Sequence, residues 1–209
     1  MNLETGKNLG GIGAILLVIG FVGIIGTGYS GILSLIGLVL VLIAMKGLSD
    51  YYKDAGIFNN TLYGFVTSII GVVAFVAVIV VTLLETIADL GIVDWTNSAE
   101  WTAAFQESFS DMSALLNFVG GIIVAFVVLF ILLVIAAIFY RKSLNMLSSK
   151  SGVGMFSTAG LVLLIGAILT IILIGVIVIW IALILLAVAF FSIKPATTQA
   201  PPSTSPPPP

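Results

Sequence analysis

Long apolar stretches alternate with short polar segments along this chain of 209 residues. A helix needs about 20 apolar residues to cross a hydrocarbon core of about 30 Å, and six stretches approach or exceed that length. The predicted spans are residues 9–26, 30–46, 62–85, 114–140, 155–172 and 174–193. The pattern therefore predicts an all-α fold, a polytopic membrane helix bundle with six transmembrane helices.

The last two spans come from one apolar run, between Val153 and Ile193, that contains no charged residue. A single straight helix of that length would run about 60 Å, twice the thickness of the bilayer core. The run is therefore expected to fold back, and the best break lies between Thr170 and Gly175.

The outer loop 86–113, between the third and fourth spans, has the pattern of an amphipathic helix. Asn97 followed by Glu100 is typical of a helix start. The apolar side of the loop carries Trp101, Phe105, Phe109 and Met112, and the opposite side carries Glu100, Glu107 and Asp111. We expect an outer amphipathic helix over 98–112, aromatic face down, that covers the apolar turn at 171–174. The alternative is a recognition surface for a cation or a basic partner.

Charged residues indicate an orientation. With a cytoplasmic N-terminus, every basic residue lies on the cytoplasmic side: Lys7, Lys46, Lys53, Arg141, Lys142, Lys150 and Lys194. Most acidic residues then lie outside: Asp89, Asp94, Glu100, Glu107 and Asp111. Because Lys and Arg in short loops set orientation, we predict a multi-pass protein of the cell membrane with both termini in the cytoplasm.

Composition agrees with a membrane protein and narrows the chemistry. The chain is 60% hydrophobic and 8% charged, whereas a soluble domain carries about 25% charged residues. It contains neither Cys nor His, so thiolates and the usual neutral-pH base and metal ligand are absent. It also has no basic cluster suited to nucleic acid. We therefore predict no catalytic, cofactor-binding or metal-binding residues, no cofactor and no nucleic-acid partner.

Few polar side chains fall within the predicted spans. Glu85 lies at a span end and is interpreted as a solvated boundary residue. Asn117 is expected to hydrogen-bond to a neighbouring helix, because its own backbone cannot satisfy its amide. Asn59 or Asn60 is interpreted as the cap of the third span. The remaining hydroxyls are expected to bond to their own helices: Ser34, Thr67, Ser68 and Thr82.

Glycine marks surfaces for close helix packing. In the first span Gly13, Gly20 and Gly23 share one face, and Gly10 forms a small-xxx-small pair with Ala14. Similar surfaces are expected in the fourth and fifth spans, at Gly120, Gly121, Gly160 and Gly166.

The chain divides into a membrane domain, 1–194, and a tail, 195–209, that holds all seven Pro residues and no charge. A tail of Pro, Thr, Ser, Ala and Gln cannot bury a core and is predicted to be disordered. The alternative is a docking peptide for a proline-binding groove.

Three segments carry a family resemblance: LGGIGAILLVIG near the N-terminus, KGLSDYYKDAGIFNNTLYG at 46–64, and FSTAGLVLLIGAIL leading to AFFSIK. They resemble an uncharacterised, mainly archaeal, integral-membrane family catalogued as domain of unknown function nine-nine-six. The likeness covers nearly the whole chain except the outer loop and the tail. It implies an archaeal cell membrane and assigns no activity, substrate or functional residue.

The function favoured by the sequence is a non-enzymatic scaffold or assembly partner in the cell membrane. The alternative is a small oligomeric transporter or channel subunit, which would normally use Pro-broken helices and charged midplane residues. An intramembrane enzyme is disfavoured because no His, Cys or mid-span acid is present. The expected partners are the lipid bilayer and either a second copy of the chain or other membrane proteins.

Overall fold

The computed structural model describes residues 2–23, 30–91 and 96–194, and in these ranges all regular structure is helical. The elements in chain order are α1 (Leu3–Gly23), α2 (Ser30–Tyr51), α3 (Ala55–Asp89), α4 (Ser98–Ser110), α5 (Met112–Ser151), α6 (Met155–Leu169), a 3-10 turn (Thr170–Ile172) and α7 (Ile174–Phe191). The all-α expectation is confirmed for these residues. The predicted tail lies outside them.

Five helical segments are long and apolar enough to cross a membrane: Gly31–Tyr51, Ala55–Asp89, Met112–Ser151, Met155–Ile172 and Ile174–Phe191. They correspond to the second to sixth predicted spans and are consistent with a multi-pass membrane protein. The first predicted span, 9–26, runs partly beyond the described residues. Its described part is α1, which has 21 residues and is not one of the five.

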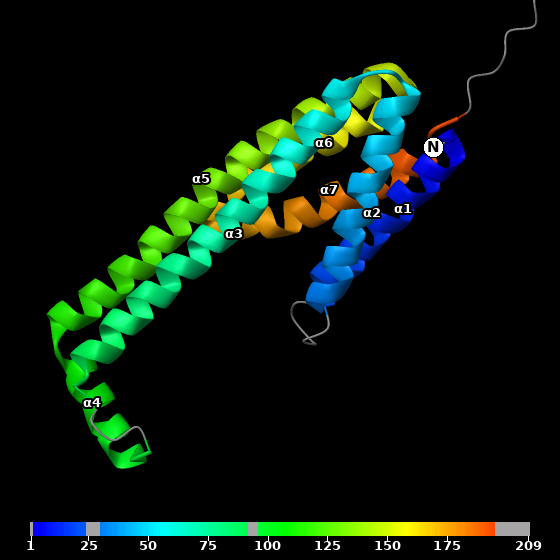
Figure 1. Cartoon of the computed structure of the whole chain (residues 1–209). Helices are drawn as coiled ribbons and strands as arrows, with labels where there is room; N and C mark the ends of the chain where they lie inside the picture. Colours follow the sequence, from blue (N-terminus) through cyan, green and yellow to red (C-terminus); the bar gives the residue numbers. More distant parts are fainter. Residues whose placement is uncertain (1, 24–29, 92–95, 195–209) are drawn as a thin grey trace, which may run out of the picture.

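The helices form two arms that meet at one end and diverge toward the other (Figure 1). The longer arm is the antiparallel pair α3 and α5, and the shorter is the pair α1 and α2. The α6–α7 hairpin joins them, because α6 packs on α5 and α7 packs on α1. Trp180 of α7 also donates a hydrogen bond to the Val18 carbonyl of α1, at 3.3 Å.

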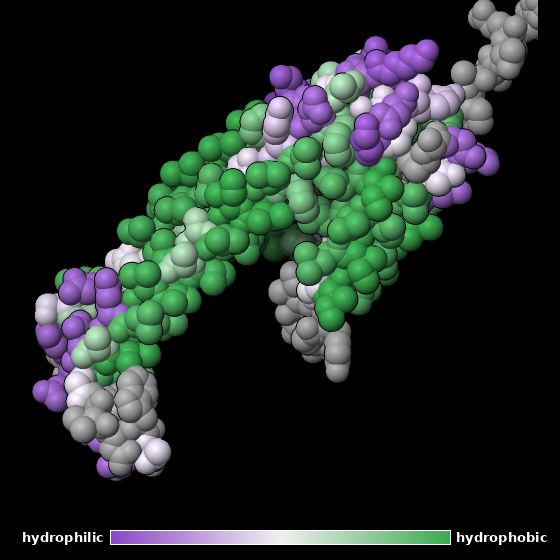
Figure 2. Space-filling view, in the orientation of Figure 1, coloured by the Kyte–Doolittle hydropathy of each residue, from purple (hydrophilic) through white to green (hydrophobic). Residues whose placement is uncertain are grey.

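Polar residues gather at two ends of the molecule, with an apolar surface between them (Figure 2). The basic end is where the arms meet; it carries the α2–α3 turn and the end of α5, with Lys46, Lys53 and Lys150. The acidic end is the far end of the α3–α5 arm, with α4. A hydrophobic core fills the basic end. Its largest side chains are Met45, Leu48, Ile57, Leu147, Phe156, Phe190 and Ile193.

Glycines allow close helix contacts at several of the predicted positions. A Cβ added to Gly13 of α1 would lie 2.7 Å from the carbonyl oxygen of Gly37 in α2. Gly10, one turn earlier, faces the Phe190 ring of α7. Gly166 of α6 lies against Ile179 of α7, where an added Cβ would approach to 2.8 Å. Helix α1 therefore packs on α2 through Gly13 and on α7 through Gly10.

The third span begins earlier than predicted. Asp54 is the cap of α3, and its carboxylate accepts a hydrogen bond from the N–H of Gly56 at 3.0 Å. The prediction that Asn59 or Asn60 caps this helix is wrong, because both lie inside α3. Hydropathy marks only the part of a helix that is apolar, and α3 continues into polar sequence beyond it.

The turn between α6 and α7 is not covered by α4, so that prediction is wrong. Ile171 is 71% exposed and Leu173 is 76% exposed. The physical reason is length. At 1.5 Å per residue, α5 runs about 60 Å and the segment Met155–Ile172 about 27 Å. The hairpin therefore ends beside the middle of the long arm, while α4 lies at its far end (Figure 1).

Candidate functional site

The acidic end is built by two helix caps in sequence. Asn97 caps α4, and its side-chain oxygen accepts hydrogen bonds from the N–H groups of Ala99 at 3.1 Å and Glu100 at 3.4 Å. This confirms the predicted helix start. Asp111 ends α4 and caps α5, accepting from the N–H of Ser113 at 2.9 Å.

The predicted aromatic stripe is shortened by that second cap. Because α4 ends at Ser110, Met112 is the first residue of α5, and it is 67% exposed. Its assignment to the stripe is therefore wrong. The side chain of Phe109 lies outside the part that the structure describes. The described part of the stripe consists of Trp101 and Phe105, whose rings are stacked with their centroids 5.8 Å apart.

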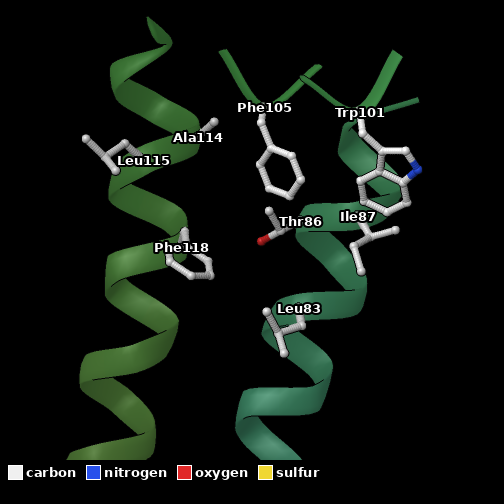
Figure 3. Close-up of a pocket in the computed structure, with 8 residues that line it drawn as sticks. All are labelled: Leu83, Thr86, Ile87, Trp101, Phe105, Ala114, Leu115 and Phe118. Carbon is white, nitrogen blue, oxygen red and sulfur yellow. The ribbon is translucent and has the colours of Figure 1, made fainter. Parts of the chain in front are cut away.

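These two rings cover an apolar pocket between the far ends of α3 and α5 (Figure 3). The pocket has a volume of about 160 Å³. Its walls are Leu83, Thr86 and Ile87 of α3, Trp101 and Phe105 of α4, and Ala114, Leu115 and Phe118 of α5. The hydroxyl of Thr86 donates to the Thr82 carbonyl at 2.8 Å, so the hydroxyl is engaged by its own helix.

The size and lining of this pocket limit what it can hold. Sites for small molecules usually measure about 300–1,000 Å³, whereas a cavity of about 150 Å³ lined by apolar side chains holds a molecule such as benzene. The pocket therefore suits a single ring or a short stretch of hydrocarbon. Its lining contains no ionisable side chain that could act as an acid or base.

The structure brings Thr82 and Gly121 together at the contact between α3 and α5, whereas Asn117 lies outside that contact. Thr82 is buried, and its side chain lies directly against Gly121 of α5. Asn117 is exposed and has no hydrogen-bond partner among the described residues, so its expected bond to another helix is not formed within this part of the chain. Gly120 faces open space, so its predicted close contact with another helix is not formed among the described residues. Glu85 is exposed on α3.

The sequence did not predict a cluster of polar side chains between α3 and α5 at the basic end. The hydroxyls of Thr61 and Ser143 are 2.7 Å apart and buried, and Ser143 also donates to the Ile57 carbonyl. Asn60 donates to the Gly56 carbonyl at 2.7 Å and to the Met146 sulfur at 3.6 Å. These residues were missed because they lie just beyond the predicted spans. The available signal was the presence of small polar residues at the facing ends of two long helices.

Metal-ligating groups are sparse. Within the ranges 2–23, 30–91 and 96–194, no three acidic side chains are close enough to hold a metal ion together. Glu100, Glu107 and Asp111 therefore do not form a shared site in the described acidic end.

The chain resembles known proteins over most of its length. The family described as protein of unknown function DUF996 matches residues 33–184, a range that includes the outer loop. An uncharacterised protein of Methanocaldococcus jannaschii is 32% identical over 193 residues, which cover 92% of this chain and 94% of that protein. No solved structure matches. The chain belongs to the DUF996 family, as its membrane-helix pattern and its KGLSDYYKD segment led us to expect.

Proposed function

We propose that this chain is a non-enzymatic, multi-pass membrane protein that acts as a scaffold or assembly partner. Docking would occur on the α3–α5 arm. The observation that carries the proposal is the open face of α5, defined here by Asn117 and Gly120. These residues are three positions apart, so they share one side of the helix. Asn117 is exposed, and a Cβ added to Gly120 would meet no atom within 4 Å.

A second helix would complete this face. An amide in an apolar environment is costly until it is hydrogen-bonded, and a glycine lets another backbone come close. The adjacent Gly121 already serves this purpose within the chain, because it receives the side chain of Thr82 from α3. The open face offers the same kind of contact to a partner, together with an amide that can donate and accept.

A topology follows from the same proposal. We infer six spans with α1 as the first, and both termini in the cytoplasm. This orientation is supported by the basic residues around the α2–α3 turn and the end of α5, and by the acidic residues at α4. The open face then lies near the outer surface, since Asn117 is six residues, or about 9 Å, from Asp111 along α5.

The test uses single cysteines, because the natural chain has none. Gly120→Cys should form disulfide-linked dimers in native membranes under mild oxidation if the partner is a second copy. Val73→Cys, which places the thiol at an exposed position of α3, is the control and should remain monomeric. A photoreactive amino acid in place of Asn117 should crosslink to a partner protein on illumination.

Two results would contradict the proposal that the protein is a scaffold. Adducts of Asn117 to lipid alone, with no dimer from Gly120→Cys, would show that the open face contacts only the bilayer. Ion or solute flux across the membrane of vesicles that contain the pure protein would instead favour a function as a transporter or channel subunit.

A further inference from the structure

A second pocket, with a volume of about 300 Å³, lies at the basic end. It is formed by the last turns of α2 and the first turns of α3, and its walls include Lys46, Asp50, Lys53 and Asp54. Unlike the pocket at the acidic end, it is lined largely by charged and polar groups. The open face of α5 does not contribute to it.

The backbone of this turn has an unusual residue at its centre. The N–H of Asp54 bonds to the carbonyl of Ser49 at 3.0 Å, and the N–H of Lys53 bonds to the carbonyl of Asp50 at 3.3 Å. This pair of bonds is the Schellman arrangement, whose left-handed residue is usually glycine. Here that residue is Lys53, with φ of +53°. A side chain is thus retained where glycine fits the backbone better.

Within the part of the chain that the structure describes, the ion pairs around the pocket leave the ammonium of Lys53 without a carboxylate partner. Lys46 pairs with Asp50 at 2.7 Å, and Lys150 pairs with Asp54 at 3.7 Å. Lys53 is exposed and makes no ion pair with any described residue. The lining itself carries two lysines and two aspartates. Because Lys150 of α5 pairs with Asp54 from outside the lining, Lys53 is left as the unpaired charge of this group.

We propose that this pocket binds the phosphate of an anionic lipid headgroup and that Lys53 supplies the charge that holds it. A lysine ammonium binds phosphate as a point charge. The pocket wall also includes Ala55, the first residue of α3, whose N–H has no hydrogen-bond acceptor among the described residues. A free N–H at a helix start favours an anion, and Ala55 supplies it beside the carboxylate of Asp54, which already accepts from the N–H of Gly56.

The location favours a lipid over a free anion. Tyr51 and Tyr63 are exposed on either side of the turn, and tyrosines concentrate at the level of lipid headgroups. In the proposed orientation this turn faces the cytoplasm, where pockets between helices that present a basic residue are typical sites for anionic headgroups. Strained backbone can persist where function requires it, and a phosphate-binding role would account for Lys53 in place of glycine.

The proposal predicts opposite changes in stability and in binding for one substitution. Lys53→Gly should raise the unfolding temperature of the full chain in lipid-free detergent, because it removes the backbone strain. The same variant should bind phosphatidylglycerol at least about fivefold more weakly, the factor expected for one lysine near an anionic surface. Lipid binding would be measured by native mass spectrometry across a lipid titration.

Two controls separate this site from general attraction between charges. Lys194→Gln removes one basic residue outside the pocket and should change the affinity less than twofold. Lys53→Arg keeps the charge and should retain binding. Equal losses for Lys53→Gly and Lys194→Gln would overturn the proposal in favour of diffuse attraction.

A third experiment distinguishes a lipid phosphate from free inorganic phosphate. Phosphatidylglycerol should raise the unfolding temperature of the natural chain, and phosphatidylcholine should raise it much less. Inorganic phosphate at millimolar concentration should have little effect. Protection by inorganic phosphate equal to that by phosphatidylglycerol would show that the pocket takes the free anion, and would overturn the lipid assignment.

Discussion

At the scale of single residues, the atom that a glycine faces decides whether a side chain could replace it. Gly13 and Gly37 face each other, and an added Cβ on either would lie 2.7 Å from the other's carbonyl oxygen. A backbone oxygen cannot rotate away, so both helices would have to move. Gly10 faces the ring of Phe190, which is buried and packs edge-on against Phe156, so a side chain at Gly10 would disturb the core at the basic end.

Gly13→Leu should therefore destabilise the protein by about 1–3 kcal/mol, the usual cost of overpacking. Gly31→Leu is the matched control, because Gly31 lies in α2 with no atom within 4 Å of its added Cβ. The unfolding midpoints of both variants would be measured in mild detergent. Equal midpoints would show that α1 and α2 are not held at the Gly13–Gly37 contact.

Asp111 makes a charge-dependent contribution at the α4–α5 junction. Hydrogen bonds from the O–H and N–H of Ser113 hold the pKa of this carboxyl below its ordinary value of 3.8. A lowered pKa means that the folded state favours the carboxylate. The resulting stability is complete above the unfolded-state pKa and is lost as the pH falls through the lower folded-state pKa.

Asp111→Ala should consequently lower the unfolding midpoint at pH 7, and its difference from the natural chain should shrink as the pH falls below about 3.8. Ser113→Ala should raise the pKa of Asp111, as followed by carboxyl NMR titration. A midpoint difference that is constant from neutral to acid pH would show that the charge of Asp111 does not contribute.

At the scale of elements, the sequence predicted which segments are helical better than where they end. Hydropathy located the segments that became α2, α3, α5, α6 and α7, because about 20 apolar residues in a row have few alternatives to a spanning helix. It placed the start of α3 too late. Asp54 is a good capping residue, but its role depends on a turn held by Ser49, whose hydroxyl donates to the Asp54 carbonyl at 2.8 Å.

The position of α4 could not be predicted from its own pattern. The alternation of aromatic and acidic residues indicates a helix with one apolar face but does not identify the surface beneath it. The cap at Asp111 starts α5 immediately after α4, so Trp101 and Phe105 remain close to the end of their own arm. The apolar turn at 171–174 is too distant for such a short connection.

Removing the two rings should therefore loosen the acidic end only. In Trp101→Ala plus Phe105→Ala, hydrogen exchange should rise about tenfold or more at the pocket walls, residues 83–87 and 114–118. Exchange at 170–176 should remain at the level of the natural chain and serves as the internal control. A rise in exchange at 170–176, without a change at the pocket walls, would show that α4 contacts the α6–α7 turn after all.

At the scale of the whole molecule, the divergence of the two arms was not predictable from composition. Lipid tails are as apolar as leucine, so a residue facing lipid and a residue facing another helix look alike in the sequence. The difference lies in a few small or polar residues. Gly13, Gly37 and the Thr61–Ser143 hydroxyl pair mark contacts within the chain, whereas Asn117 and Gly120 mark a face that the described chain leaves open.

The proposed orientation makes a prediction for the molecule as a whole. Ser98 begins α4 at the acidic end and Ser149 lies beside Lys150 at the basic end, and both are exposed. Since the chain has no natural cysteine, Ser98→Cys in intact cells should react with an impermeant thiol reagent. Ser149→Cys should react only after lysis, which also shows that its thiol is accessible. The opposite pattern would place the basic end outside, against the tendency of Lys and Arg to remain in the cytoplasm. It would also move the proposed lipid pocket to the outer leaflet.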